Sequence, residues 1–156
     1  MPINYIPFYT DLNKNSWSIK IDVDSLRRDF MKLDGLLIIK AFVSLFFGIL
    51  LLAVPAKLGT IIGLELSSYG IFMAREYGGA LIGIFFLCWF SRDSAGSKAL
   101  NAVILWGFIY DLVNLIVAFA AILSGTMNSL GWAIVAVYLL FAIGFGYFLF
   151  LKPKTQ

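Results

Sequence analysis

The sequence predicts an all-α integral membrane protein: a four-helix bundle preceded by a short N-terminal cytoplasmic arm and an interfacial helix. Three observations predict this fold class. The 156 residues are 61% hydrophobic and only 13% charged, whereas a soluble domain is about half apolar and a quarter charged. The mean hydropathy is +0.91. The apolar residues gather into four runs, each long enough to cross about 30 Å of hydrocarbon as a helix.

The four predicted spans end at polar or helix-breaking segments. Pro55 ends the first run, because proline lacks an N–H and disfavours helix in the residue before it. The polar stretch "SRDSAGSK" ends the second run, "SGTMNS" ends the third, and "KPKTQ" follows the fourth. We expect helices because a lone strand in lipid leaves its backbone groups unpaired. The spans cover about residues 36–54, 71–90, 99–123 and 130–151, within a bundle domain of residues 35–152.

Residues 1–34 form the predicted cytoplasmic arm. Its stretch "SWSIKIDVD" alternates apolar and polar residues, which is typical of a half-buried strand. A lone strand is unstable in water, so this stretch is either a disordered or surface-lying arm or adds to the sheet of a partner. Leu26, Phe30, Leu33 and Leu37 then share one helical face, which predicts an interfacial helix running into the first span.

Basic residues predict the orientation. They recur through the arm, at Arg92 and Lys98 after the second span, and at Lys152 and Lys154 in the tail, whereas the other side has Lys57. By the positive-inside rule, we expect both termini to be cytoplasmic. On the opposite side, the apolar connection after Pro55 is expected to lie in the membrane interface or over the mouth of the bundle.

The composition argues against several classes of site. The chain has no histidine and one cysteine, Cys88, which removes the usual ligands of a metal site and the CxxC redox pair. We find no phosphate-binding glycine motif and no Ser/His/Asp set. The net charge of +3 is too small and dispersed to indicate nucleic-acid binding. We therefore expect no metal, no cofactor, no catalytic residue and no nucleic-acid partner, and a protein that is not an enzyme.

Charged residues inside the spans are the candidate functional residues. Asp111 lies near the middle of the third span, where an aspartate costs about 2.5–3.5 kcal/mol on translocon scales. Helix rise places Arg75 of the second span at nearly the same depth. Glu76 lies beside Arg75, and Asn114 lies one turn beyond Asp111. We predict an intramembrane polar cluster of these four residues, in which Arg75 pairs with Asp111.

The role of this cluster stays open at the level of sequence. It is either structural, locking two helices together, or a ligand or proton site, because ionisable groups inside a membrane are frequently functional. Alternatively, span two begins near Met73, which leaves Arg75 and Glu76 among the headgroups. Lys40, about one turn into span one, is expected to extend its side chain to the cytoplasmic interface. The alternative for Lys40 is a partner inside the bundle.

Small residues predict where the helices approach one another, because they let a neighbouring backbone come close. They recur four residues apart, on one face of a helix. The three pairs are Ser44 and Gly48, Gly79 and Gly83, and Ala142 and Gly146. We interpret them as ordinary helix packing, and the alternative is a dimer motif.

A span that ends at Pro55, an apolar outer connection and then "MAREYGGALIGIFFLCWFSRD" together resemble small bacterial four-helix membrane proteins of the DoxX-like and uncharacterised-domain type. The resemblance covers about residues 34–151. It implies a four-helix fold in a bacterial cytoplasmic membrane. Some proteins of this type resemble accessory subunits of membrane oxidoreductases, but no cofactor ligand of that group can be carried over to this chain.

Three functions compete. The first is a non-catalytic accessory or interaction subunit, which packs against a larger membrane assembly through the arm and the helix faces. The second is a small homo-oligomeric transporter or channel that uses Arg75, Glu76 and Asp111 as a polar gate. The third is a lipid-modifying enzyme with Glu76 or Asp111 as its base. We favour the first, because the chain lacks catalytic motifs and carries many aromatic residues suited to lipid or partner surfaces.

Overall fold

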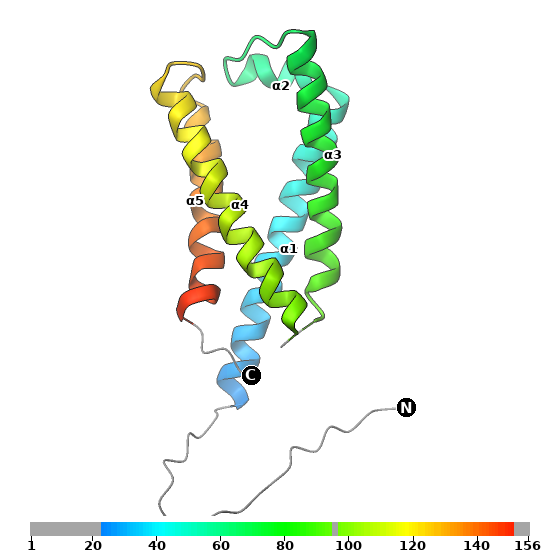
Figure 1. Ribbon diagram of the computed structural model, residues 1–156, viewed down its shortest axis with the longest axis vertical. Helices are drawn as coiled ribbons and strands as arrows, with labels where there is room; N and C mark the ends of the chain where they lie inside the picture. Colours follow the sequence, from blue (N-terminus) through cyan, green and yellow to red (C-terminus); the bar gives the residue numbers. More distant parts are fainter. Residues whose placement is uncertain (1–22, 95–96, 152–156) are drawn as a thin grey trace, which may run out of the picture.

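The computed structural model describes residues 23–94 and 97–151, and every regular element within these ranges is helical (Figure 1). The all-α fold class is confirmed for these residues. Four helical segments are long and apolar enough to cross a membrane: Lys32–Ala53, Ser68–Ser91, Lys98–Leu123 and Gly131–Leu151. The elements are α1 (Val23–Ala53), α2 (Pro55–Ile61), α3 (Ser68–Ser91), α4 (Lys98–Leu123), α5 (Gly131–Gly146) and a π-helical turn (Tyr147–Leu151).

The helix ends follow from local chemistry. Pro55 separates α1 from α2 and occupies the first turn of α2, where its missing N–H costs nothing. The hydroxyl groups of Ser67 and Ser97 cap α3 and α4 by accepting hydrogen bonds from the backbone N–H groups of Gly70, at 3.2 Å, and Leu100, at 3.0 Å. Gly125, with φ of 70°, turns the chain after α4.

Most of the predicted arm lies outside the described residues, including residues 17–22 of the strand-like stretch. Its last two residues, Val23 and Asp24, begin α1 and are not strand. Helix α1 continues from there to Ala53 without a break. The predicted interfacial segment and the first span therefore form one continuous helix.

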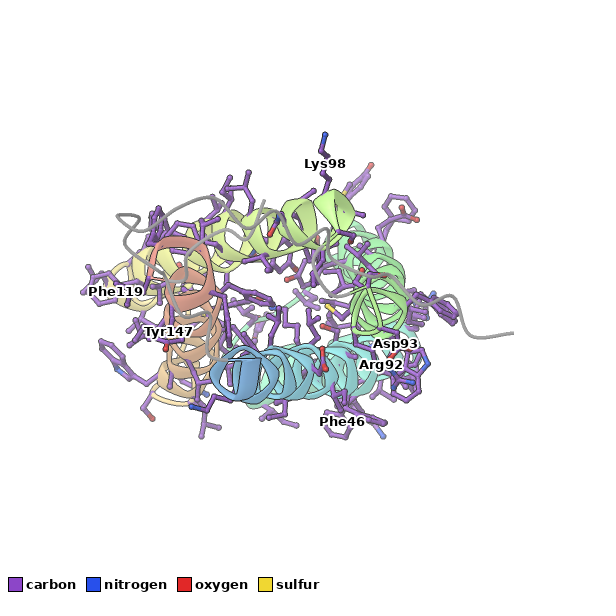
Figure 2. The ribbon with its side chains drawn as sticks, turned by 90° about the horizontal axis from the view of Figure 1, so that it is seen from below. Phe46, Arg92, Asp93, Lys98, Phe119 and Tyr147 are labelled. Atoms are coloured by element: carbon purple, nitrogen blue, oxygen red, sulfur yellow. The ribbon has the colours of Figure 1, made fainter. Side chains whose placement is uncertain are left out.

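The four long helices form a ring when viewed along their length (Figure 2). Helix α1 packs along α3 and α4 packs along α5, while the contacts of α3 with α4 and of α1 with α5 are fewer. The order around the ring is therefore α1, α3, α4, α5, with α1 diagonally opposite α4. The two helix pairs diverge toward the end of the molecule that carries α2 (Figure 1).

Close backbone approach defines the packing within each pair. In the first pair, Gly48 of α1 lies against Gly78 of α3, where an added Cβ would come within 3.0 Å of the facing carbonyl oxygen. In the second pair, a Cβ on Gly107 would meet the Phe145 ring at 2.9 Å. These glycines let the helices come closer than larger residues would allow.

The α2 end of the molecule is tied together by one residue of the α4–α5 connection. The Asn128 backbone N–H donates to the carbonyl oxygen of Ile62 at 2.9 Å, and its side-chain amide donates to that of Ile61 at 2.8 Å. The chain after Pro55 thus reaches across to the second helix pair.

The outer surface of the ring is apolar. Phe46 and Phe119 point away from the centre (Figure 2), and both are exposed. A large exposed apolar surface is unfavourable in water but matches the hydrocarbon of a bilayer. The charged residues Asp93 and Lys98 lie away from this surface. Asp93 is in the α3–α4 connection, and Lys98 is the first residue of α4.

Candidate functional site

A buried ion pair lies inside the ring. The Lys40 ammonium of α1 donates a hydrogen bond to Oδ1 of Asp111 on α4. Only 3% of Lys40 and none of Asp111 is exposed. Because α1 and α4 are diagonally opposite, this pair crosses the centre of the bundle.

Three tyrosine hydroxyl groups bridge the other diagonal. The Tyr77 hydroxyl of α3 is 2.6 Å from that of Tyr110 on α4 and 2.8 Å from that of Tyr138 on α5. The ion pair and the tyrosines together draw on all four long helices. Hydrogen bonds between helices in lipid stabilise packing modestly, by about 0.6 kcal/mol each. The stabilisation of the bundle therefore comes from several such bonds together at its centre.

Aromatic rings surround the Lys40 ammonium. Its nitrogen lies 4.5 Å from the ring centroid of Phe141, 5.1 Å from that of Tyr110 and 6.0 Å from that of Tyr138. A cation near the face of such rings is attracted to their electron density, and more strongly where water is absent. The rings thus offset part of the cost of removing this charge from water.

One atom of the site has no partner among the described residues. Oδ2 of Asp111 is buried and accepts no hydrogen bond from them. An ionised carboxylate normally accepts several, and a buried acceptor left without one is unfavourable. We name Lys40, Asp111, Tyr77, Tyr110 and Tyr138 the inner cluster.

The predicted partnership of Asp111 is wrong. Asp111 binds Lys40, whereas Arg75 and Glu76 lie exposed on the outside of α3. The Asn114 amide does not complete the cluster either, since it donates to the backbone oxygen of Tyr110 at 2.8 Å. Depth alone had matched Arg75 to Asp111, but Arg75 is exposed on the outside of α3, whereas Asp111 on α4 is buried inside the ring.

The prediction that Gly79 and Gly83 pack against another helix of the bundle is wrong for the same reason. Gly79 and Gly83 are exposed, and a Cβ on either would meet nothing within 4 Å. The buried residues of this helix are Gly78, Leu81, Ile84 and Cys88. Turning the helix this way buries apolar groups and leaves two charges outside. We call Arg75, Glu76, Gly79, Gly83 and Phe86 the outer face of α3.

The other small-residue pairs do pack inside. Ser44 and Gly48 are buried on α1. Ala142 is 5% exposed, and a Cβ on Gly146 would come within 3.1 Å of the Phe108 ring. Two of the three predicted pairs are therefore contact positions.

Lys40 does not extend to the membrane interface as expected. The segment of α1 that is long and apolar enough to cross a membrane begins at Lys32, which places Lys40 about 12 Å along the helix from that end. The sequence did carry a signal for its burial. Lys40 lies three residues after Leu37 and four before Ser44, and both belong to the buried stripe of α1.

Comparisons of the chain with protein-family models, curated proteins and solved structures gave no match. The resemblance to DoxX-like proteins therefore stays a prediction.

Proposed function

We propose that this protein is a non-catalytic accessory subunit of a membrane assembly, which binds its partner mainly through the outer face of α3. One observation carries the proposal: Arg75, Glu76, Gly79 and Gly83 all lie on the outside of the helix ring. Lipid tails cannot pair with charges and gain no close packing from glycines, whereas a partner helix can pair with the charges and pack closely on the glycines.

The inner cluster supports a structural role for the bundle. Lys40 and Asp111 are almost fully buried and bound to each other. Neither side chain is open to a substrate in this arrangement. The third hypothesis, lipid chemistry with Asp111 as base, has little support for that reason. The arm of residues 1–34 is a further contact in this proposal, although it lies mostly outside the described residues.

Photo-crosslinking in cells tests the proposal. A photoreactive phenylalanine analogue at Phe86 on α3 is expected to give an adduct of one defined mass. The control is the same analogue at Ile143, which is 64% exposed on α5. A single partner species at Phe86 that is a different protein from this chain, and none at Ile143, would support the subunit role. No adduct at either site, or equal adducts at both, would contradict it.

The proposal includes a location in the cytoplasmic membrane of a bacterium, with both termini in the cytoplasm. Arg92 and Lys98 flank the α3–α4 connection, and Lys57 lies in α2 at the opposite end. Cysteine labelling distinguishes the two orientations. A Ser129→Cys variant should react with an impermeant reagent in intact cells, and an Asp93→Cys variant should react only after lysis. The reverse pattern would overturn the orientation.

A second candidate function is a small oligomeric transporter. The observation in its favour is Oδ2 of Asp111, a buried carboxylate oxygen without a partner among the described residues, because such a group can carry a proton or receive a cation. The polar gate predicted from the sequence does not form, because Arg75 and Glu76 lie outside the ring and Asp111 lies inside it. In this candidate function, Lys40 and Asp111 are the polar residues of the pathway. Asp111-dependent proton or cation uptake into proteoliposomes, lost in Asp111→Asn, would favour this candidate over the accessory subunit.

A further inference from the structure

Six residues on the outside of α3 follow a heptad spacing. The steps between them are four, three, four, three and four residues, which is the spacing of the a and d positions of a coiled coil. Three are phenylalanines, exposed by 51% to 71%, and the other three are also exposed. We name this set the α3 seam: Phe72, Glu76, Gly79, Gly83, Phe86 and Phe90.

The centre of the α3 seam is shaped for a helix. Gly79 and Gly83 lie one turn apart, and a Cβ on either would meet nothing within 4 Å. Glycine weakens a helix relative to alanine, and nothing within this chain needs glycine at these two positions. Within a membrane, such a pair lets a second helix approach backbone to backbone.

The charges at one end of the α3 seam identify the second helix. Arg75 and Glu76 are consecutive, so their side chains diverge by about 100° and do not face each other on the helix. They form no ion pair with another side chain in the described part of the protein. An opposite charge at the same depth on a neighbouring molecule would satisfy each of them.

We propose that the occupant of the α3 seam is α3 of a second copy of this chain. Two copies insert in the same orientation, so a two-fold axis along the membrane normal sets the two α3 helices parallel and at equal depth. In parallel knobs-into-holes packing, an a-position side chain fits beside the residue that precedes the equivalent a position of its partner. Glu76 of each copy then meets Arg75 of the other, so the dimer gains two ion pairs, which offset the approach of the two Glu76 carboxylates across the axis.

This inference rests on the proposed function, because it names the first component of the assembly that α3 joins. The crosslinking experiment at Phe86 distinguishes the two proposals. A self-adduct at Phe86 alone would support the dimer and overturn the larger assembly. An adduct with a different membrane protein, without a self-adduct, would overturn the dimer and leave the accessory role standing.

Charge reversal is the sharpest test. The full chain is reconstituted into phosphatidylcholine and phosphatidylglycerol vesicles at decreasing protein-to-lipid ratios, and dimers are counted by single-molecule photobleaching. Arg75→Glu and Glu76→Arg should each weaken dimerisation at least tenfold, because each places like charges together. The double variant with both changes should return to within about threefold of the unchanged chain. A double variant that stays as weak as the singles would overturn the proposal.

A matched pair of glycine variants separates dimerisation from folding. Gly79→Leu should abolish the dimer and leave each copy folded, since its Cβ has free space. Gly35→Leu on α1, also with nothing within 4 Å, should leave the dimer unchanged. Monomers of the unchanged chain at every dilution, or a dimer that survives Gly79→Leu, would overturn the α3 seam as an interface.

Discussion

Two pairs of opposite charges lie within the membrane helices, and the fold treats them differently. Lys40 and Asp111 come from different helices, point inward and bind each other. Arg75 and Glu76 are neighbours on one helix, point outward and are exposed. In low dielectric a charge needs a partner in either place. The inner pair finds it within the chain, whereas the described residues provide no ion-pair partner for Arg75 or Glu76.

The largest effect on stability is expected from Asp111→Ala, which removes one half of the inner pair. It leaves the Lys40 ammonium buried without its carboxylate, and breaking a buried pair costs about 3–5 kcal/mol. We expect a loss of about 3 kcal/mol in the free energy of unfolding, measured by steric trapping in lipid bicelles. The double variant Lys40→Met with Asp111→Leu should be less damaging than Asp111→Ala alone. If the losses of Lys40→Met and Asp111→Leu, measured separately, simply add up to the loss of the double variant, the pair is not coupled.

Two adjacent glycines sharpen the contrast between the faces of α3. A Cβ on Gly78 would lie 2.9 Å from the backbone oxygen of Gly48, whereas a Cβ on Gly79 would meet nothing. Gly78→Ala should cost about 1–3 kcal/mol of unfolding free energy through overpacking. Gly79→Ala should be neutral or stabilise by up to about 1 kcal/mol. Equal effects at the two positions would mean that α3 is turned differently.

The tyrosine bridge is expected to contribute less than the ion pair. Tyr77→Phe removes both hydrogen bonds of the central hydroxyl, at about 0.6 kcal/mol each in a membrane. We expect a loss of about 1 kcal/mol in the unfolding free energy, by the same bicelle measurement. Tyr69→Phe, at a residue 83% exposed, is the control and should change nothing. A loss as large as that of Asp111→Ala would mean that the tyrosine hydrogen bonds stabilise the bundle as much as the ion pair does, contrary to this prediction.

The smallest effect is expected at the outer pair. Arg75→Gln and Glu76→Gln remove charges that no described residue of the same chain satisfies, so the stability of the monomer should stay within about 0.5 kcal/mol. The measurement is made at a protein-to-lipid ratio low enough to exclude association. A loss of several kcal/mol would show that these side chains belong to the interior of the bundle after all.

Length, hydrophobicity and boundary residues were sufficient to predict the four spans. The span predicted at 99–123 begins within one residue of α4 (Lys98–Leu123), and Pro55 separates the first two helices as expected. These features are local: apolar runs match the thickness of a bilayer, and proline or serine sets the end of a helix. They act on a segment regardless of what lies beside it.

Which residues meet inside the bundle was decided only by the tertiary structure. The sequence alone showed that Lys40, Arg75 and Asp111 are charges within apolar runs, and helix rise matched Arg75 to Asp111 by depth. It did not show how far α3 is turned about its axis. The contact of Gly78 with Gly48 sets that rotation, and one residue along a helix turns a side chain by about 100°. Rotation depends on packing between helices distant in sequence. The rotation of α3 turned Arg75 outward, and the rotations of α1 and α4 brought Lys40 to Asp111.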